Sequence, residues 1–297
     1  MAGVDINRTT NGVLLPPAVS QQIWQNVQQA SIIQQLVPQI DLPAGGLSIP
    51  IITGDPQAEW VDETDEKPVS RGSLSSKNIK GYTLAVIVPF SNQFKRDLPG
   101  LYNALVSRLP RVLAKKFDRT CLGFDPSPGT GFDTLAAAPT ASIATNVYDG
   151  YVDALESVAA VEGSDVERWV LTSQAEIAAL GAKDTMGRPI FIDSVTREGR
   201  VEREILARPV SKTPHAYKAG SPSTVGFGGE WSTAMWGYVE GLSIDISSQA
   251  SLTDGAETLN LWQRNMFAVR VEFEVGFAVR DVNRFVRITG ANAAPGS

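Results

Sequence analysis

The strongest hydrophobic pattern in the chain predicts one long amphipathic helix over residues 98–124. Its apolar side chains recur every four residues: Leu101, Leu105, Leu109, Leu113, Phe117 and Cys121. That spacing places them on one face of a helix about 40 Å long, which we interpret as a core-facing spine. Arg108, Arg111 and Lys115 fall on the remaining surface, which could meet DNA, meet an acidic neighbour or be solvated.

Alternation of apolar and polar residues predicts strands on either side of this helix. Residues 82–90 indicate one strand, and residues 264–289 indicate a strand pair. In the second stretch the apolar side chains face one way: Val269, Val271, Phe273, Val275 and Phe277. Glu272 and Glu274 face the other way beside Arg270, so we interpret them as a salt-bridged sheet face rather than a catalytic pair.

The middle of the chain predicts shorter elements. These are helices at 147–161 and near 174–180, and strands at 168–171, 189–192 and 204–210. Residues 226–229 (GFGG) resemble a phosphate-binding loop. They are not followed by Lys-Ser or Lys-Thr and do not open a helix, so we do not expect a nucleotide site.

A segment of segregated charge separates the predicted strands 47–52 and 82–90. It first carries six acids and no base: Asp55, Glu59, Asp62, Glu63, Asp65 and Glu66. Four bases and no acid follow: Lys67, Arg71, Lys77 and Lys80. Such a segment has too few large apolar residues to bury a core of its own. We interpret it as an extended hairpin that lies on another surface, and a disordered acidic loop is the alternative.

The N-terminal region predicts a polar arm at 1–13 and then a helix with Val19, Ile23 and Val27 on its apolar face. Glutamines fill the opposite face. That face suits a polar, uncharged contact, and an ordinary solvated helix surface is the alternative.

Composition and charge argue against several classes of protein function. The chain has 297 residues, a net charge of −6 and a pI of about 5.0, which argues against a dedicated nucleic-acid binder. A single cysteine, Cys121, and a single histidine, His215, are too few for a disulfide or a zinc site of Cys and His ligands. No G-x-S-x-G motif frames a serine nucleophile, and no apolar run approaches the roughly 20 residues of a membrane span. These observations argue against the commonest hydrolase and metalloenzyme classes, and we expect no cofactor, no metal and no membrane association.

Several short motifs, which follow one another in a fixed order along the chain, resemble those of a known protein family. They are residues 58–63 (AEWVDE) followed by Lys67 and Pro68, residues 117–123 (FDRTCLG), residues 180–189 (LGAKDTMGRP), residues 208–210 (RPV) with 225–228 (VGFG), and residues 264–272 with 276–279 (GFAV). From about residue 14 to residue 290 the chain resembles the major capsid proteins of tailed bacteriophages, which have the Hong Kong 97-type fold. The order of these motifs is more specific than any one motif.

The resemblance implies an α+β fold of that type, with five parts in chain order. They are an N-terminal arm and helix (1–40), an extended β-hairpin loop with flanking strands (41–90), the spine helix of a peripheral domain (91–131), a mixed axial domain (132–250), and the return strands of the peripheral domain with the C-terminus (251–297). The axial domain would be inserted between two parts of the peripheral domain.

The resemblance also implies a structural protein of the virion with no catalytic activity. It would assemble with itself into hexamers and pentamers of an icosahedral head that encloses double-stranded DNA, in the cytoplasm of a host bacterium. The further implied partners are portal and scaffolding proteins, decoration proteins, and DNA held through non-specific contacts. An encapsulin-type shell that houses an enzyme is the alternative within this fold, and an unrelated α/β enzyme is the alternative outside it.

The implied inter-subunit contacts lie on the extended loop: Glu59, Trp60, Asp62, Glu63, Lys67, Arg71, Lys77 and Lys80. In the founding member of the family, a loop lysine forms an isopeptide bond with an asparagine, and a glutamate seven residues after that asparagine acts as base. Asn265 and Glu272 have this spacing here, and the nucleophile would be Lys67, Lys77 or Lys80. None of these lysines has a distinctly apolar sequence setting, so we expect shells without covalent crosslinks.

Overall fold

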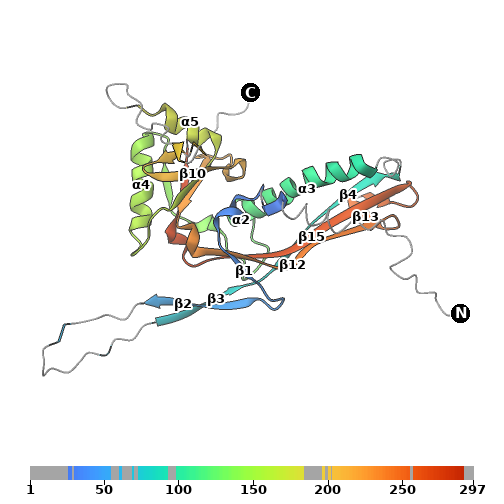
Figure 1. Cartoon of the computed structure of the whole chain (residues 1–297), viewed down its shortest axis with the longest axis horizontal. Coiled ribbons are helices and arrows are strands. Elements are labelled where there is room, and N and C mark those ends of the chain that lie inside the picture. The colour runs from blue at the N-terminus through green and yellow to red at the C-terminus, as the bar shows by residue number, and fades with distance from the viewer. Residues whose placement is uncertain are drawn as a thin grey trace.

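The computed structural model describes residues 26–28, 30–54, 60–61, 69, 73–92, 98–183, 196–197, 200–201, 203–254 and 257–290. The expected arm at 1–13 and the expected strand at 189–192 lie outside these residues. The described chain contains two larger β-sheets, each covered by helix, and a strand pair that projects from them (Figure 1).

The longer sheet has four strands in the order β1-β12-β15-β4. They span Gln39–Asp41 (β1), Ala234–Ser247 (β12), Met266–Val279 (β15) and Tyr82–Ser91 (β4). Strand β15 pairs antiparallel with both neighbours, and it sets Phe273 opposite Leu84 and Phe277 opposite Trp236. Phe273 and Phe277 are buried whereas Arg270 is exposed, so the alternation in the sequence separates the two faces of β15.

Helix α3 (Leu98–Cys121) lies along this sheet (Figure 1). Leu109, Leu113 and Phe117 are at most 5 % exposed and share one hydrophobic cluster with the apolar face of β15. Leu101 and Leu105 lie in the same helix, but their side chains are not among those described. The contact between α3 and β15 therefore forms the main core.

Helix α3 ends at Cys121 because Gly123 adopts a left-handed conformation, with φ of +75°. The amide of Phe124 then donates to the carbonyl of Arg119, which satisfies an acceptor that the last helical turn leaves unpaired. A Cβ atom on Gly123 would lie 2.4 Å from the backbone nitrogen of Ala136. Both the conformation and the available space therefore require glycine.

The second sheet has six strands in the order β5-β16-β11-β6-β10-β9. They span Thr140–Ser142 (β5), Phe285–Thr289 (β16), Thr224–Gly229 (β11), Arg168–Leu171 (β6), Arg208–Lys212 (β10) and Glu204–Ile205 (β9). Helices α4 (Val147–Ala159) and α5 (Ser173–Gly181) pack on this sheet. Both helices begin at residues whose side chains accept hydrogen bonds from first-turn amides, Asn146 and Thr172.

The glycine-rich run 226–229 lies in β11, a fully buried strand inside the six-stranded sheet. A Cβ atom on Gly228 would lie 2.3 Å from the ring of Trp169, and one on Gly229 would lie 2.5 Å from the ring of Phe285. These glycines therefore make room for two large buried rings, and the run serves sheet packing rather than nucleotide binding.

The remaining described elements are short. They are α2 (Ile32–Leu36); strands β2 (Leu47–Gly54), β3 (Ser73–Ile79), β7 (Thr196–Arg197), β8 (Arg200–Val201), β13 (Ser251–Asp254) and β14 (Glu257–Asn260); and 3-10 turns η2 (Leu135–Ala137), η3 (Pro214–Ala216), η4 (Trp231–Thr233) and η5 (Val282–Arg284). Strands β2 and β3 form an antiparallel pair that reaches away from both larger sheets (Figure 1).

Three expected boundaries differ from the structure. The single strand expected at 204–210 is a tight hairpin, because Leu206 and Ala207 take positive φ values of 51° and 60°. Strand β12, expected in the axial part 132–250, pairs instead with β15 beneath the spine helix. Strand β16, expected in the peripheral part 251–297, pairs with β11 and β5 of the six-stranded sheet. The chain therefore returns to the six-stranded sheet after β15.

Replacing Leu109 by alanine is expected to lower the free energy of unfolding by about 2–5 kcal/mol, as for other buried leucines. Val112 lies on the same helix but is 53 % exposed, so Val112→Ala is the matched control and should cost no more than about 0.5 kcal/mol. Denaturant unfolding measures both variants. A loss below about 1 kcal/mol for Leu109→Ala would show that the stripe on α3 is not core.

Candidate inter-subunit surfaces

The β2–β3 pair is anchored to the body at its root. Ile79 is fully buried and clusters with Leu42 and Ala278. The Nζ atom of Lys77 lies 2.9 Å from a carboxylate oxygen of Asp133. Of the two described lysines expected in inter-subunit contacts, Lys77 is thus paired within its own chain, whereas Lys80 is exposed.

Beyond this root, the described side chains of the connecting segment include two exposed apolar residues. Trp60 is 105 % exposed and Val69 is 86 % exposed. Five other predicted contact residues lie outside the described residues: Glu59, Asp62, Glu63, Lys67 and Arg71. Tryptophan is among the residue types most enriched at the energetic centres of protein interfaces. Trp60 is therefore the strongest described candidate for a contact on this segment.

The outer face of α3 is basic. Arg108, Arg111 and Lys115 are exposed there, beside the exposed Val112. Lys116 is held within the chain, where its Nζ atom donates at 2.8 Å to Asp125 and lowers the pKa of that carboxyl. The three exposed bases thus offer positive charge to a partner.

Glu272, which has the spacing from Asn265 that a crosslink would need, belongs to a group of charges on the outer face of β15. Arg270 donates to Asp245 at 2.7 Å and lies 3.3 Å from Glu272. The hydrogen bond to Asp245 and then the charge of Glu272 raise the pKa of Arg270. The interpretation of Glu272 as part of a salt-bridged sheet face is confirmed.

Asn265 itself lies in the turn before β15 with φ of +53°. Its side-chain oxygen accepts a hydrogen bond from Nδ2 of Asn92 at 2.7 Å. Extended backbone separates Asn265 from Glu272 by about 23 Å, at roughly 3.3 Å per residue. The two side chains of one chain therefore cannot form one reaction site, and a crosslink would need Glu272 from another copy.

The structure also contains a buried polar junction that no sequence pattern predicts. Asp118 of α3 is fully buried, and its carboxylate accepts hydrogen bonds from the Ser31 hydroxyl and from the amides of Ile32 and Ile33, where α2 begins. Nδ1 of His215 in η3 lies 2.6 Å from the same carboxylate. The available signals were an acid next to an apolar stripe and a serine before a short apolar run, and neither signal identifies the partner.

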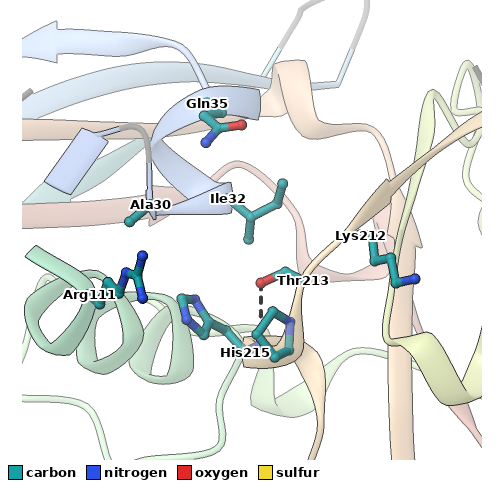
Figure 2. A pocket seen from close by; sticks show the side chains of 8 residues that line it. Ala30, Ile32, Gln35, Arg111, Lys212, Thr213 and His215 are labelled. Carbon is teal, nitrogen blue, oxygen red and sulfur yellow. Dashed lines mark hydrogen bonds between the residues drawn. The ribbon is translucent and has the colours of Figure 1, made fainter. Parts of the chain in front are cut away.

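A cavity of about 300 Å³ opens beside this junction, between α2, α3 and η3 (Figure 2). Ile32, Arg111 and His215 approach it from these three elements, while Lys212 at its edge is 2.5 Å from Glu176. The described residues include no group of His, Cys, Asp and Glu side chains that could hold a metal ion. Burial raises the pKa of the Cys121 thiol, which keeps it protonated and unreactive.

Within the described part of the chain, no helix is both long and apolar enough to cross a membrane. The spine helix on a long four-stranded sheet, the second mixed sheet and the projecting strand pair together form the Hong Kong 97-type fold of shell proteins. Residues 11–290 match the model of the phage capsid family, and the chain belongs to that family.

Similar sequences and a solved structure of similar fold also come from phages. The chain is 31 % identical over 299 residues to the probable major capsid protein gp17 of Mycobacterium phage L5, covering 94 % of this chain and 90 % of the relative. It is 22 % identical to the major capsid protein of Klebsiella oxytoca phage phiKO2, covering 90 % of this chain and 66 % of that protein. A solved structure from Mycobacterium phage Adephagia has a TM-score of 0.71 at 17 % identity, covering 89 % of this chain and 91 % of that one.

The chain is thus a structural major capsid protein of the virion shell, where it associates with itself. The encapsulin alternative is not favoured, because these relatives are phage capsid proteins.

Boiled mature particles are expected to run on a denaturing gel as a single band near the chain mass of 31.9 kDa. The reason is that Lys77 and the Asn265 carboxamide are both held within their own chain. A ladder of multiples that disappears in Asn265→Asp or Glu272→Ala particles, but persists in Glu274→Ala particles, would contradict this prediction.

Proposed function

We propose that this chain forms the hexamers and pentamers of an icosahedral phage head that encloses double-stranded DNA. The observation that carries this proposal is the β2–β3 pair, which projects from the body (Figure 1). It leaves the body at a buried root, and the chain then continues to the exposed Trp60. A subunit with such a projection leaves apolar surface uncovered when it is alone. A neighbouring copy of the same chain provides the surface that covers it.

The acidic part of the loop and the basic face of α3 are complementary. Six acids lie between residues 55 and 66, and Arg108, Arg111 and Lys115 are exposed on the helix. We propose that the acidic part of one subunit's loop lies on α3 of its neighbour. Opposite charges on the two surfaces would suppress wrong registers and guide the encounter.

The overall charge suits a DNA container. A net charge of −6 avoids the strong non-specific binding that a basic lining would give to incoming DNA. We therefore propose that DNA touches the shell only through weak, non-specific contacts. Portal, scaffolding and decoration proteins are the further partners that the family implies, with assembly in the cytoplasm of the host bacterium.

Expression of the intact chain is expected to give closed shells visible by negative-stain electron microscopy. Deletion of residues 58–76 removes most of the projecting segment but keeps the buried root at Ile79, so it should give a folded subunit that does not close shells. Size-exclusion chromatography of the two proteins measures the difference. Shells of normal size from the deleted chain would contradict the proposal.

Reversal of charge on α3 provides a sharper test of the loop contact. The triple variant Arg108→Glu, Arg111→Glu, Lys115→Glu should fail to form shells, because it places acids against acids. Adding Glu59→Lys, Asp62→Lys and Glu63→Lys to the same chain should restore shell formation. Normal assembly of the triple variant, or failure of the rescue in a chain with an unchanged circular-dichroism spectrum, would place the loop elsewhere.

A further inference from the structure

Three segments that are far apart in the sequence meet at the carboxylate of Asp118. Ser31 caps α2 in the N-terminal region, Asp118 lies near the end of α3, and His215 lies in η3, the turn that follows β10 of the six-stranded sheet. Ser31 and Asp118 are fully buried, and the His215 side chain is 13 % exposed. The junction therefore connects the N-terminal region to the helix of one sheet and to a turn of the other.

The carboxylate is saturated with donors. Oδ1 accepts from the Ser31 hydroxyl at 2.5 Å and from the Ile33 amide at 3.4 Å. Oδ2 accepts from the Ile32 amide at 3.1 Å and pairs with Nδ1 of His215 at 2.6 Å. Where Nδ1 carries the ring proton of His215, the carboxylate accepts all four hydrogen bonds.

Buried charge makes these four contacts depend on one another. Each hydrogen bond helps to compensate for the water that the carboxylate has lost. When one donor is removed, the closed junction holds a charge that is less well compensated, and an open junction that admits water becomes relatively more favourable. The cavity bordered by Ile32, Arg111 and His215 leaves room at this point for such an opening (Figure 2).

The end of α2 is fixed separately from this junction. The carbonyl of Val37, which follows the helix, accepts a hydrogen bond from Nε1 of Trp236 at 3.1 Å. Opening at Asp118 would therefore release the start of α2 and the residues before it while Val37 stays attached to the four-stranded sheet.

We propose that Asp118 couples the attachment of residues 31–33 to the position of the η3 turn. Loosening the contact of Asp118 with residues 31–33 loosens its contact with His215, and the reverse also holds. Movement of the η3 turn relative to α3 would change the hydrogen bonds that hold the amides of Ile32 and Ile33. The coupling is a property of the single chain and does not depend on the proposed shell assembly.

Hydrogen exchange of the full-length chain tests the coupling in both directions. His215→Ala is expected to raise exchange at the Ile32 and Ile33 amides about tenfold, because it removes one hydrogen bond to a charged group. His215→Asn places a donor on the atom bonded to Cγ, as Nδ1 is, and should restore most of the protection. Ser31→Ala should raise exchange across residues 213–217, because coupling between two sites is reciprocal.

Asp245→Asn is the control, because it removes an exposed carboxylate that pairs with Arg270 on the outer sheet face, away from both segments. It should leave exchange in both segments unchanged. Asp118→Asn should loosen both segments together, and the variants at Ser31 and His215 decide the question even where Asp118→Asn does not fold. If His215→Ala affects only residues 213–217 and Ser31→Ala affects only residues 26–37, the two contacts are independent and the proposal is wrong.

Discussion

Packing of the apolar stripe of α3 on the apolar face of β15 removes from water the two most regular hydrophobic surfaces of the chain. The surfaces that matter for assembly are positioned by this contact. With Leu113 and Phe117 turned toward the sheet, Arg111 and Lys115 are left facing outward. Strand β4 pairs along β15, and the projecting pair β2–β3 leaves the body just before β4 begins. This hydrophobic packing therefore sets where the basic face of α3 and the root of the projecting pair lie.

Charged side chains of this chain interact in two settings, on an exposed sheet face and at a buried junction between segments. Paired charges such as Arg270 with Asp245 lie on the outer sheet face, while Asp118 adds buried hydrogen bonds between segments that also share the main hydrophobic cluster. The two arrangements differ in how much they contribute to the stability of the fold. An exposed pair on a sheet contributes little to stability, whereas a buried carboxylate with four donors is strongly destabilising when a donor is lost.

Regular periodicity made the long elements predictable from the sequence. The spacing from Leu109 to Phe117 and the alternation from Val269 to Phe277 each repeat often enough to overcome local ambiguity. The sheet that β12 joins and the sheet that β16 joins were not predictable, because each choice depends on strands that lie far away in the sequence. The same holds for Asp118, whose partners Ser31 and His215 are 87 and 97 residues distant. Leu206 and Ala207 gave no turn signal, because positive φ is uncommon for such residues.

Strand β16 lies between β5 and β11, although every other strand of both larger sheets precedes it in the chain. A ribosome must therefore synthesise the protein through Thr289 before the six-stranded sheet can close. The four-stranded sheet likewise waits for β15, which ends at Val279. Contacts of such long sequence separation form slowly. A nascent chain consequently closes neither sheet before Val279 has been synthesised, so a neighbouring chain that binds earlier meets an incomplete subunit.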